Sequence, residues 1–420
     1  MTFVRRHLIL CATAACLAGY TYAYTSGRAG LPIRSDAYSY YVYLPALALY
    51  HDPSLQAVAD DCCGGTFPAW TAISRWRGTR RWVDAHPIGV AVMTAPFFVA
   101  AHLLTRWTNL SPDGFTPYYQ HGAGLAGLTC VIAGLWFLRR LLRRHFSDAT
   151  ADASLVALLA GTSLYHYATF DSTWSHAFSF VLCAALFERL DGWHDEAGTA
   201  DAAAIGAIAG LMVLVRHTNA VIAAALGLTL VVRSRSFRAA LPVVIAVAAA
   251  SLIPQAWLYH RATNHWFVSA YGDMGFTWRS PHIAGVLVSP AKGLFFWAPL
   301  LLAAVAGLGV LPASLRRWRP AIAAILVIHT YLIASWWDWQ FGASFGHRGF
   351  VDVYPLLSPG LAAVFSRAAV RPSLRAVTTV AVVLLCALSI FQMLQYWHGV
   401  MPMSDTTWAQ YRGAFLRGWW

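Results

Sequence analysis

Charged residues are scarce in this sequence. Only 11% of the 420 residues are charged, whereas about a quarter are charged in an ordinary soluble protein. Hydrophobic residues account for 58% of the chain, and the mean hydropathy is +0.52. This composition excludes a soluble globular protein and predicts an all-α polytopic membrane protein.

Several motifs are also missing. No CxxC or Cys/His spacing indicates a zinc site, and no GxxxxGK[ST] phosphate loop is present. Of the seven cysteines, only Cys62 and Cys63 lie outside apolar segments, and adjacent cysteines are poorly placed to bridge each other. We expect no metal and no cofactor beyond a co-substrate. With no repeat, low-complexity stretch or linker, residues 1–420 are expected to form one integral membrane domain.

The net charge of +12 does not indicate a nucleic-acid partner. In a polytopic membrane protein, an excess of arginine is explained by cytoplasmic loops. Residues 1–25 carry Arg5 and Arg6 ahead of an apolar run but lack the small residues that signal cleavage requires. We therefore expect an uncleaved first crossing in a plasma (inner) membrane.

Apolar runs long enough to cross a membrane recur along the chain, since about 17 to 25 residues span the hydrocarbon layer. They lie at residues 8–25, 86–104, 121–142, 153–170, 174–190, 202–232, 239–258, 294–311, 320–337, 349–366 and 375–397. The run at 202–232 is interrupted by Arg216-His217-Thr218-Asn219, and the run at 86–104 follows His86-Pro87.

Arginine clusters decide how these two runs are interpreted. If 202–232 forms two short crossings and 86–104 lies in the outer interface, every cluster falls on the cytoplasmic side, as the positive-inside rule requires. The clusters are Arg5/Arg6, Arg139/Arg140/Arg143/Arg144, Arg233/Arg235/Arg238, Arg316/Arg317/Arg319 and Arg367/Arg371/Arg375. This predicts about eleven crossings with a cytoplasmic N-terminus, a first outer loop at 26–120 with in-plane helices, and an outer tail at 398–420.

The predicted inner loops are too short to form a nucleotide-binding domain, so we expect any active site to be extracytoplasmic. Asp36 lies just after the first crossing, in a tyrosine-rich stretch. We interpret it as a catalytic base. The alternative is a helix N-cap on an interfacial helix.

Other polar residues gather in the predicted outer segments. His86 follows a basic strip that has the character of a lipid head-group site, with a solvated loop as the alternative. Asp171 and His176 flank a turn where they are candidates for sugar contacts, with helix capping as the alternative. Arg216 marks a polar elbow, which at membrane depth must line a cavity or be buried in protein; structural pairing with a carboxylate is the competing interpretation.

Two cations are candidates for binding a donor phosphate. Lys292, the only lysine, stands beside Gly293 at the start of a crossing and is otherwise interpreted as a snorkelling anchor. Arg348 ends the stretch from Trp336 to Arg348 (WWDWQFGASFGHR), where it supplies a forked donor. The aromatic residues and His347 of that stretch are candidates for sugar or lipid contacts, and a plain aromatic belt is the alternative for the tryptophans.

The order of these motifs resembles bacterial GT-C fold glycosyltransferases, relatives of the dolichyl-phosphate-mannose protein mannosyltransferases. The motifs are the early aspartate, His-Pro-Ile-Gly, Ser-His-Ala-Phe-Ser-Phe, Arg-His-Thr-Asn, Ser-Pro-Ala-Lys-Gly-Leu-Phe-Phe and Trp-Trp-Asp-Trp with Ser-Phe-Gly-His-Arg. The resemblance implies a polyprenyl-phosphate sugar donor and a first-loop carboxylate as base. Ala37 stands where a second acid often occurs, which argues against a paired-carboxylate or metal-dependent version.

The sequence therefore predicts an inverting membrane glycosyltransferase. Asp36 would take the proton of an acceptor hydroxyl, while Lys292 and Arg348 stabilise the departing phosphate. The acceptor is an envelope lipid, glycan or protein, which the sequence does not distinguish. A transporter or flippase of lipid-linked sugar is the alternative, although transporters usually carry internal repeats; an inactive lipid-binding scaffold is a third possibility.

Overall fold

Helices account for nearly all of the regular structure in this computed structural model, which describes residues 7–272 and 274–418. Of the described residues, 68% are helical. The helices are α2 (Leu8–Thr25), α3 (Asp36–Tyr41), α4 (Tyr43–Ala48), α5 (Gln56–Cys63), α6 (Gly89–Thr105), α7 (Pro117–Arg143), α8 (Asp148–Ala160), α9 (Leu164–Thr169), α10 (Ser175–Asp191), α11 (Thr199–Val215), α12 (Ala220–Arg233), α13 (Arg235–Ser251), α14 (Ile253–Thr263), α15 (Ile283–Val288), α16 (Leu294–Trp297), α17 (Leu300–Gly307), α18 (Arg319–Ser335), α19 (Tyr354–Ala369), α20 (Pro372–Trp397) and α21 (Trp408–Ala414), with 3-10 turns η1 (His217–Asn219), η2 (Leu308–Val310), η3 (Ala313–Trp318) and η4 (Arg348–Val353).

Six helical segments in the described part of the chain are long and apolar enough to cross a membrane. They are Leu8–Thr25, Pro117–Arg143, Arg235–Thr263, Ala313–Ser335, Arg348–Ala369 and Pro372–Trp397. Shorter apolar helices occupy Gly89–Thr105, Thr199–Val215, His217–Arg233 and Leu300–Val310. The helices fit a multi-pass membrane protein, while the count of eleven crossings and their orientation stay predictions.

Small residues let the central helices approach closely. α10 packs against α7, and α17 packs against α19. A Cβ added to Gly307 would lie 1.9 Å from the carbonyl oxygen of Gly360, and one added to Gly127 would lie 1.6 Å from that of Ser172. Only glycine permits these contacts, and such small-residue interfaces are typical of helix packing in membranes.

The long run at 202–232 is divided as the sequence predicts. α11 ends at Val215, Arg216 adopts an extended backbone, and η1 leads into α12. The start of α6 lies against this break, because a Cβ on Gly89 would come within 2.5 Å of the Leu214 and Val215 backbone. The His-Pro-Ile-Gly turn and the polar elbow, far apart in sequence, are therefore neighbours.

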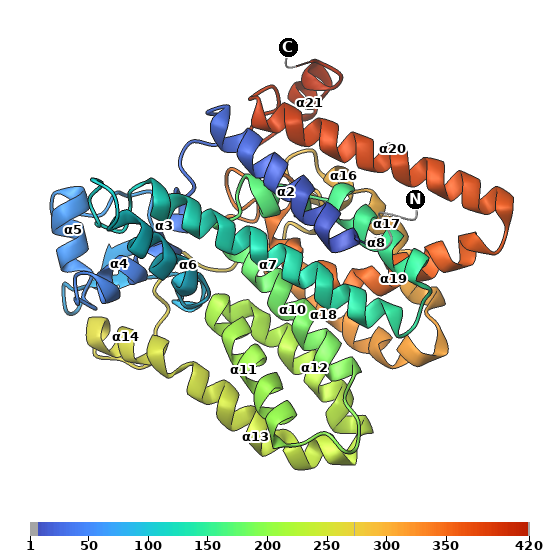
Figure 1. Cartoon of the computed structure of the whole chain (residues 1–420), viewed down its shortest axis with the longest axis horizontal. Helices are drawn as coiled ribbons and strands as arrows, with labels where there is room; N and C mark the ends of the chain where they lie inside the picture. The colour runs from blue at the N-terminus through green and yellow to red at the C-terminus, as the bar shows by residue number, and fades with distance from the viewer. Residues whose placement is uncertain (1–6, 273, 419–420) are drawn as a thin grey trace.

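The predicted first outer loop folds into several short elements. Figure 1 shows α3, α4, α5 and α6 gathered at one end of the molecule, whereas the connection between α19 and α20 lies at the opposite end. The loop also contains a two-stranded antiparallel hairpin, in which β1 (Ile73–Arg75) pairs with β2 (Trp82–Asp84). This hairpin is not among the elements predicted from the sequence.

One expectation about this loop is wrong. Cys62 and Cys63 form a disulfide with each other, although adjacent cysteines were expected to be poorly placed to do so. The pair ends α5, just before Gly64 and Gly65, whose φ angles of 60° and 86° turn the chain back. The Tyr38 hydroxyl lies 2.9 Å from Cys62 Sγ, so the disulfide packs on the helix that carries Asp36.

The arginine cluster of α7 lies far from this loop. A 27-residue helix such as α7 is about 40 Å long, and the cluster lies at its C-terminal end. There Arg139 pairs with Asp152, Arg143 with Asp148 and Arg144 with Glu188. Arg5 and Arg6, the first of the arginine clusters predicted to be cytoplasmic, lie outside the described residues.

Candidate functional site

Asp36 and Arg348 form an ion pair between the first loop and the start of a late helical segment. Asp36 is the first residue of α3, Arg348 is the first residue of η4, and Asp36 Oδ2 lies 2.8 Å from Arg348 Nη1. The side chain of Asp36 is 28% exposed and that of Arg348 is 13% exposed. The pair is thus mostly enclosed, but the carboxylate still reaches open space.

Aromatic rings hold the guanidinium of Arg348. Its Cζ atom lies 4.3 Å from the ring centroid of Trp174 and 5.6 Å from that of Phe341, within the range of a cation–π interaction. Trp174 directly precedes α10, and Phe341 belongs to the tryptophan-rich stretch singled out in the sequence. Both predicted outer segments therefore meet at the same cation.

A second buried group surrounds Asp352. Its side chain is fully buried, with His176 Nδ1 3.0 Å from Oδ1 and Arg216 Nε 3.1 Å from Oδ2. Arg216 Nη1 also lies 3.4 Å from His176 Nε2. The alternative that Arg216 pairs with a carboxylate is thus correct. Sequence reasoning missed Asp352, although an aspartate inside an apolar stretch was a usable signal.

Asp171 belongs to a third group. Arg34 Nη2 lies 2.6 Å from Asp171 Oδ1, and His166 Nε2 lies 2.8 Å from Asp171 Oδ2. Trp397 donates its indole N–H to His166 Nδ1 at 2.8 Å, which fixes His166 as the tautomer that donates to Asp171. Arg34, His166 and Trp397 are not among the candidate residues predicted from the sequence.

The charges around Asp36 keep it ionised. Burial alone raises the pKa of the Asp36 carboxyl, but the charge of the Arg348 guanidinium opposes burial, and the pKa is held below its usual value. Burial lowers the pKa of His86 to about 4, so its imidazole is neutral near pH 7. His86 stacks on Tyr40 with ring centroids 4.2 Å apart. Of the predicted residues, the structure thus brings Asp36, His86, His176, Arg216 and Arg348 together.

Lys292 and His347 make other contacts. The Lys292 side chain is buried, and its Nζ donates hydrogen bonds to the carbonyl oxygens of Ser344 and Met403. His347 is also buried, with Nε2 2.9 Å from the carbonyl oxygen of Trp339. Both side chains hold backbone of the tryptophan-rich stretch in place.

Strained backbone flanks the Asp36–Arg348 pair on both sides. Ser35 has φ 50° and ψ −132°, and Phe341 has φ 57°. Positive φ is costly for residues with a Cβ, and such strain clusters at functional sites. Ser35 precedes the carboxylate and Phe341 carries the ring beside the guanidinium. The sequence contains no signal for this, because neither residue is glycine or asparagine.

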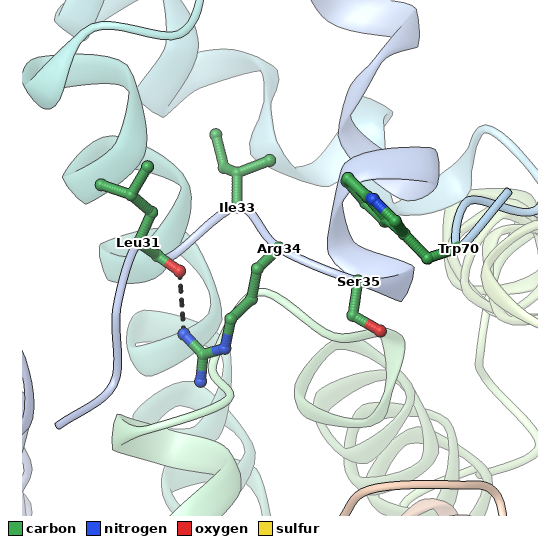
Figure 2. Close-up of a pocket in the computed structure, with 5 residues that line it drawn as sticks. All are labelled: Leu31, Ile33, Arg34, Ser35 and Trp70. Carbon is green, nitrogen blue, oxygen red and sulfur yellow. Dashed lines mark hydrogen bonds between the residues drawn. The ribbon is translucent and has the colours of Figure 1, made fainter. Parts of the chain in front are cut away.

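An open pocket of about 500 Å³ adjoins Asp36 along the chain. Figure 2 shows its lining residues, Leu31, Ile33, Arg34, Ser35 and Trp70. Leu31 is 62% exposed and Trp70 is 56% exposed, so the mouth is apolar. Arg34 contributes the only cation among these five residues, and its guanidinium is held by the carbonyl oxygens of Leu31 and Phe170 as well as by Asp171.

Within the described residues, no group of three or more histidine, cysteine, aspartate or glutamate side chains is arranged to hold a metal ion. The expectation of a metal-independent reaction stays a prediction. In comparisons with known proteins, no protein-family model matches this chain, and no curated protein sequence matches it. The geometry of the site therefore carries the functional argument.

Proposed function

We propose that this protein is a membrane glycosyltransferase of the GT-C type, which moves a sugar from a polyprenyl-phosphate donor to an acceptor hydroxyl with inversion. The observation that carries the proposal is the ionised Asp36 carboxylate beside the Arg348 guanidinium, next along the chain to Ser35, which lines an open apolar pocket. An inverting transfer requires a base for the acceptor hydroxyl and a cation for the departing phosphate, and this pair contains one group of each kind.

In this mechanism Asp36 accepts the proton of the acceptor hydroxyl while that oxygen attacks the anomeric carbon of the donor. The bond between the anomeric carbon and the phosphate oxygen breaks, and the phosphate leaves with the electron pair. Arg348 stabilises the charge that develops on the phosphate. In the unloaded protein Arg348 pairs with Asp36, so binding of the donor phosphate would draw Arg348 away and raise the basicity of the carboxylate.

The surrounding groups have supporting roles in this proposal. Asp352 and His176 hold Arg216 close enough to act on Asp36 electrostatically. Because both hydrogen bonds of the Lys292 side chain go to carbonyl groups, we assign the phosphate contact to Arg348. The apolar mouth at Leu31 and Trp70 fits a lipid-linked substrate. We place the reaction on the extracytoplasmic face, with an envelope lipid, glycan or protein as acceptor.

The test is sugar transfer in proteoliposomes. Purified protein is supplied with a radiolabelled polyprenyl-phosphate sugar and an envelope extract as acceptor, and the same vesicles are assayed for counterflow of the labelled lipid. We expect label in the acceptor fraction and none from the Asp36→Asn variant. Counterflow without transfer, unaffected by Asp36→Asn, would instead identify a transporter or flippase.

A further inference from the structure

The C-terminal segment contacts the stretch that carries Arg348. Ser344 donates its backbone N–H to the carbonyl oxygen of Met403 at 3.2 Å, and the Gln340 amide donates to Asp405 Oδ1 at 2.7 Å. Lys292 connects the same two segments, since its Nζ donates hydrogen bonds to the carbonyl oxygens of Ser344 and Met403. One side chain thus joins three segments that are far apart in sequence.

The rest of this segment is fixed against the helices around it. The Gln395 amide donates to the carbonyl oxygen of Ala414 at 2.8 Å, and the Gln392 amide donates to the Tyr411 hydroxyl at 2.8 Å. The Tyr411 ring lies 4.7 Å from that of Phe296 in α16, the short helix that follows Lys292. Residues 402–415, which we call the C-terminal strap, therefore cover both Lys292 and the stretch from Gln340 to Ser344.

The position of that stretch matters for the site. Phe341, whose backbone has positive φ, places its ring 5.6 Å from Arg348 Cζ and 5.8 Å from Arg216 Cζ. A strained conformation persists only where surrounding contacts hold it. The hydrogen bonds from Gln340 and Ser344 to the strap lie on either side of Phe341, so the strap supplies those contacts.

We propose that Lys292 is a positioning residue, which binds the C-terminal strap to the stretch from Gln340 to Ser344 and thereby holds Phe341 and Arg348 in place beside Asp36. Either protonation state of the Lys292 amine carries enough protons for its two carbonyl partners. The role therefore does not require a bound ligand. Its effect on catalysis rests on the proposed function, whereas its effect on the strap does not.

The first test is amide hydrogen exchange on the full-length protein in detergent, comparing wild type with Lys292→Met. Losing two hydrogen bonds is expected to speed exchange of the Ser344 amide and of the α21 amides by roughly 10-fold or more. Arg375→Met, which removes an exposed cation from α20, is the matched control and should leave this exchange unchanged. Unaltered exchange in Lys292→Met would overturn the proposal, whatever happens to activity.

The second test separates positioning from phosphate binding and guards against misfolding. Cysteines replace Ser344 and Met403 in the Lys292→Met background, and their cross-linking is verified by peptide mapping under non-reducing conditions. If Lys292 positions the strap, the cross-link restores slow exchange and most of kcat, with the donor KM close to wild type throughout. If slow exchange returns but the donor KM stays raised, Lys292 contacts the phosphate and the positioning role is refuted. If wild type shows no sugar transfer, the proposed function fails while the exchange result still decides the role of Lys292.

Discussion

Two groups of ion pairs, each built around a buried carboxylate, lie at opposite ends of the helix bundle, and they differ in how accessible their carboxylates are. The first group, which we call the pocket-end cluster, contains Asp36, Arg348, Asp352, His176 and Arg216. The second, which we call the helix-end cluster, contains Arg139, Arg143, Arg144, His145, Asp148, Asp152, Glu188, Asp191 and Arg317.

The helix-end cluster surrounds the buried Asp191 carboxylate with several partners. Asp191 is only 1% exposed and contacts His145, Arg317 and the Trp318 indole N–H. These partners come from the ends of regular helices and a 3-10 turn. In the pocket-end cluster, Asp36 is 28% exposed, has Arg348 as its ion-pair partner and adjoins strained backbone. Ion pairs of the same residue types thus hold helix ends together in the helix-end cluster, whereas in the pocket-end cluster they leave the Asp36 carboxylate accessible.

Replacing Asp36 should have the largest effect on activity. Asp36→Asn keeps the shape of the side chain but cannot accept the proton, so sugar transfer should fall by on the order of 10²-fold or more. Initial rates in proteoliposomes measure this. Asp60→Asn, which changes an exposed carboxylate of the same loop, is the control. Transfer by Asp36→Asn within a factor of a few of wild type would remove Asp36 from the role of base.

Replacing Arg348 should have the next largest effect. Arg348→Gln leaves the phosphate without its cation, so kcat/KM for the donor should fall by roughly 10-fold to 10²-fold. Because the mechanism has Arg348 leave Asp36 for the phosphate, this loss should include a raised donor KM. Steady-state kinetics with varied donor concentration provide the measurement. A normal donor KM would show that Arg348 serves only to pair with Asp36.

The helix-end cluster should respond in stability instead of activity. Asp191→Asn leaves Arg317 and His145 without their buried carboxylate, which should lower the free energy of unfolding by about 3 kcal/mol. Denaturation in detergent micelles measures the loss. Transfer per folded molecule should stay near wild type, and a large drop in that rate would contradict the structural role.

The stability contributed by Lys292 should depend on pH. Burial, followed by the charge of Arg348, lowers the pKa of Lys292 to about 7, below its unfolded value of about 10.4. The folded state therefore disfavours the ammonium form: the penalty is fully present below pH 7 and disappears as pH rises toward 10. Wild type should gain up to about 1.4 kcal/mol per pH unit in this window relative to Lys292→Met. If the free energy of unfolding changes with pH by the same amount in wild type and in Lys292→Met, this lowered pKa is contradicted.

The smallest effect is expected for an exposed pair of the helix-end cluster. Arg143 Nε lies 2.7 Å from Asp148 Oδ1, but the two side chains are 45% and 59% exposed. Solvent screens such pairs, so Arg143→Met should change the free energy of unfolding by less than about 1 kcal/mol. The same denaturation assay checks this, and a loss as large as that of Asp191→Asn would show that exposure does not separate the members of the cluster.

Much of the fold could be predicted from the sequence. Hydrophobic runs are long, and their ends are marked by arginine or polar turns, so the runs at 121–142 and 174–190 correspond closely to α7 and α10. The break at Arg216 was predictable because an unpaired arginine inside an apolar helix is costly. The hairpin of the first loop was not predicted, since its two three-residue strands are shorter than any periodic pattern.

The site was predictable only in part. Asp36, His176 and Arg348 stand out because polar side chains are rare among apolar neighbours. Their partners depend on tertiary contacts between distant segments, as in the pairing of Arg34 with Asp171. Lys292 stands out as the only lysine of the sequence. Its contact with Met403 joins two distant segments, and no spacing in the sequence indicates that they lie close together.

The most direct measurement is the rate of sugar transfer per folded molecule in Asp36→Asn and Asp191→Asn, assayed side by side in proteoliposomes that hold equal amounts of folded protein. Each variant removes one negative charge from one of the two clusters. We expect Asp191→Asn to keep close to the wild-type rate and Asp36→Asn to be slower by on the order of 10²-fold or more. Equal rates in the two variants would contradict this expectation.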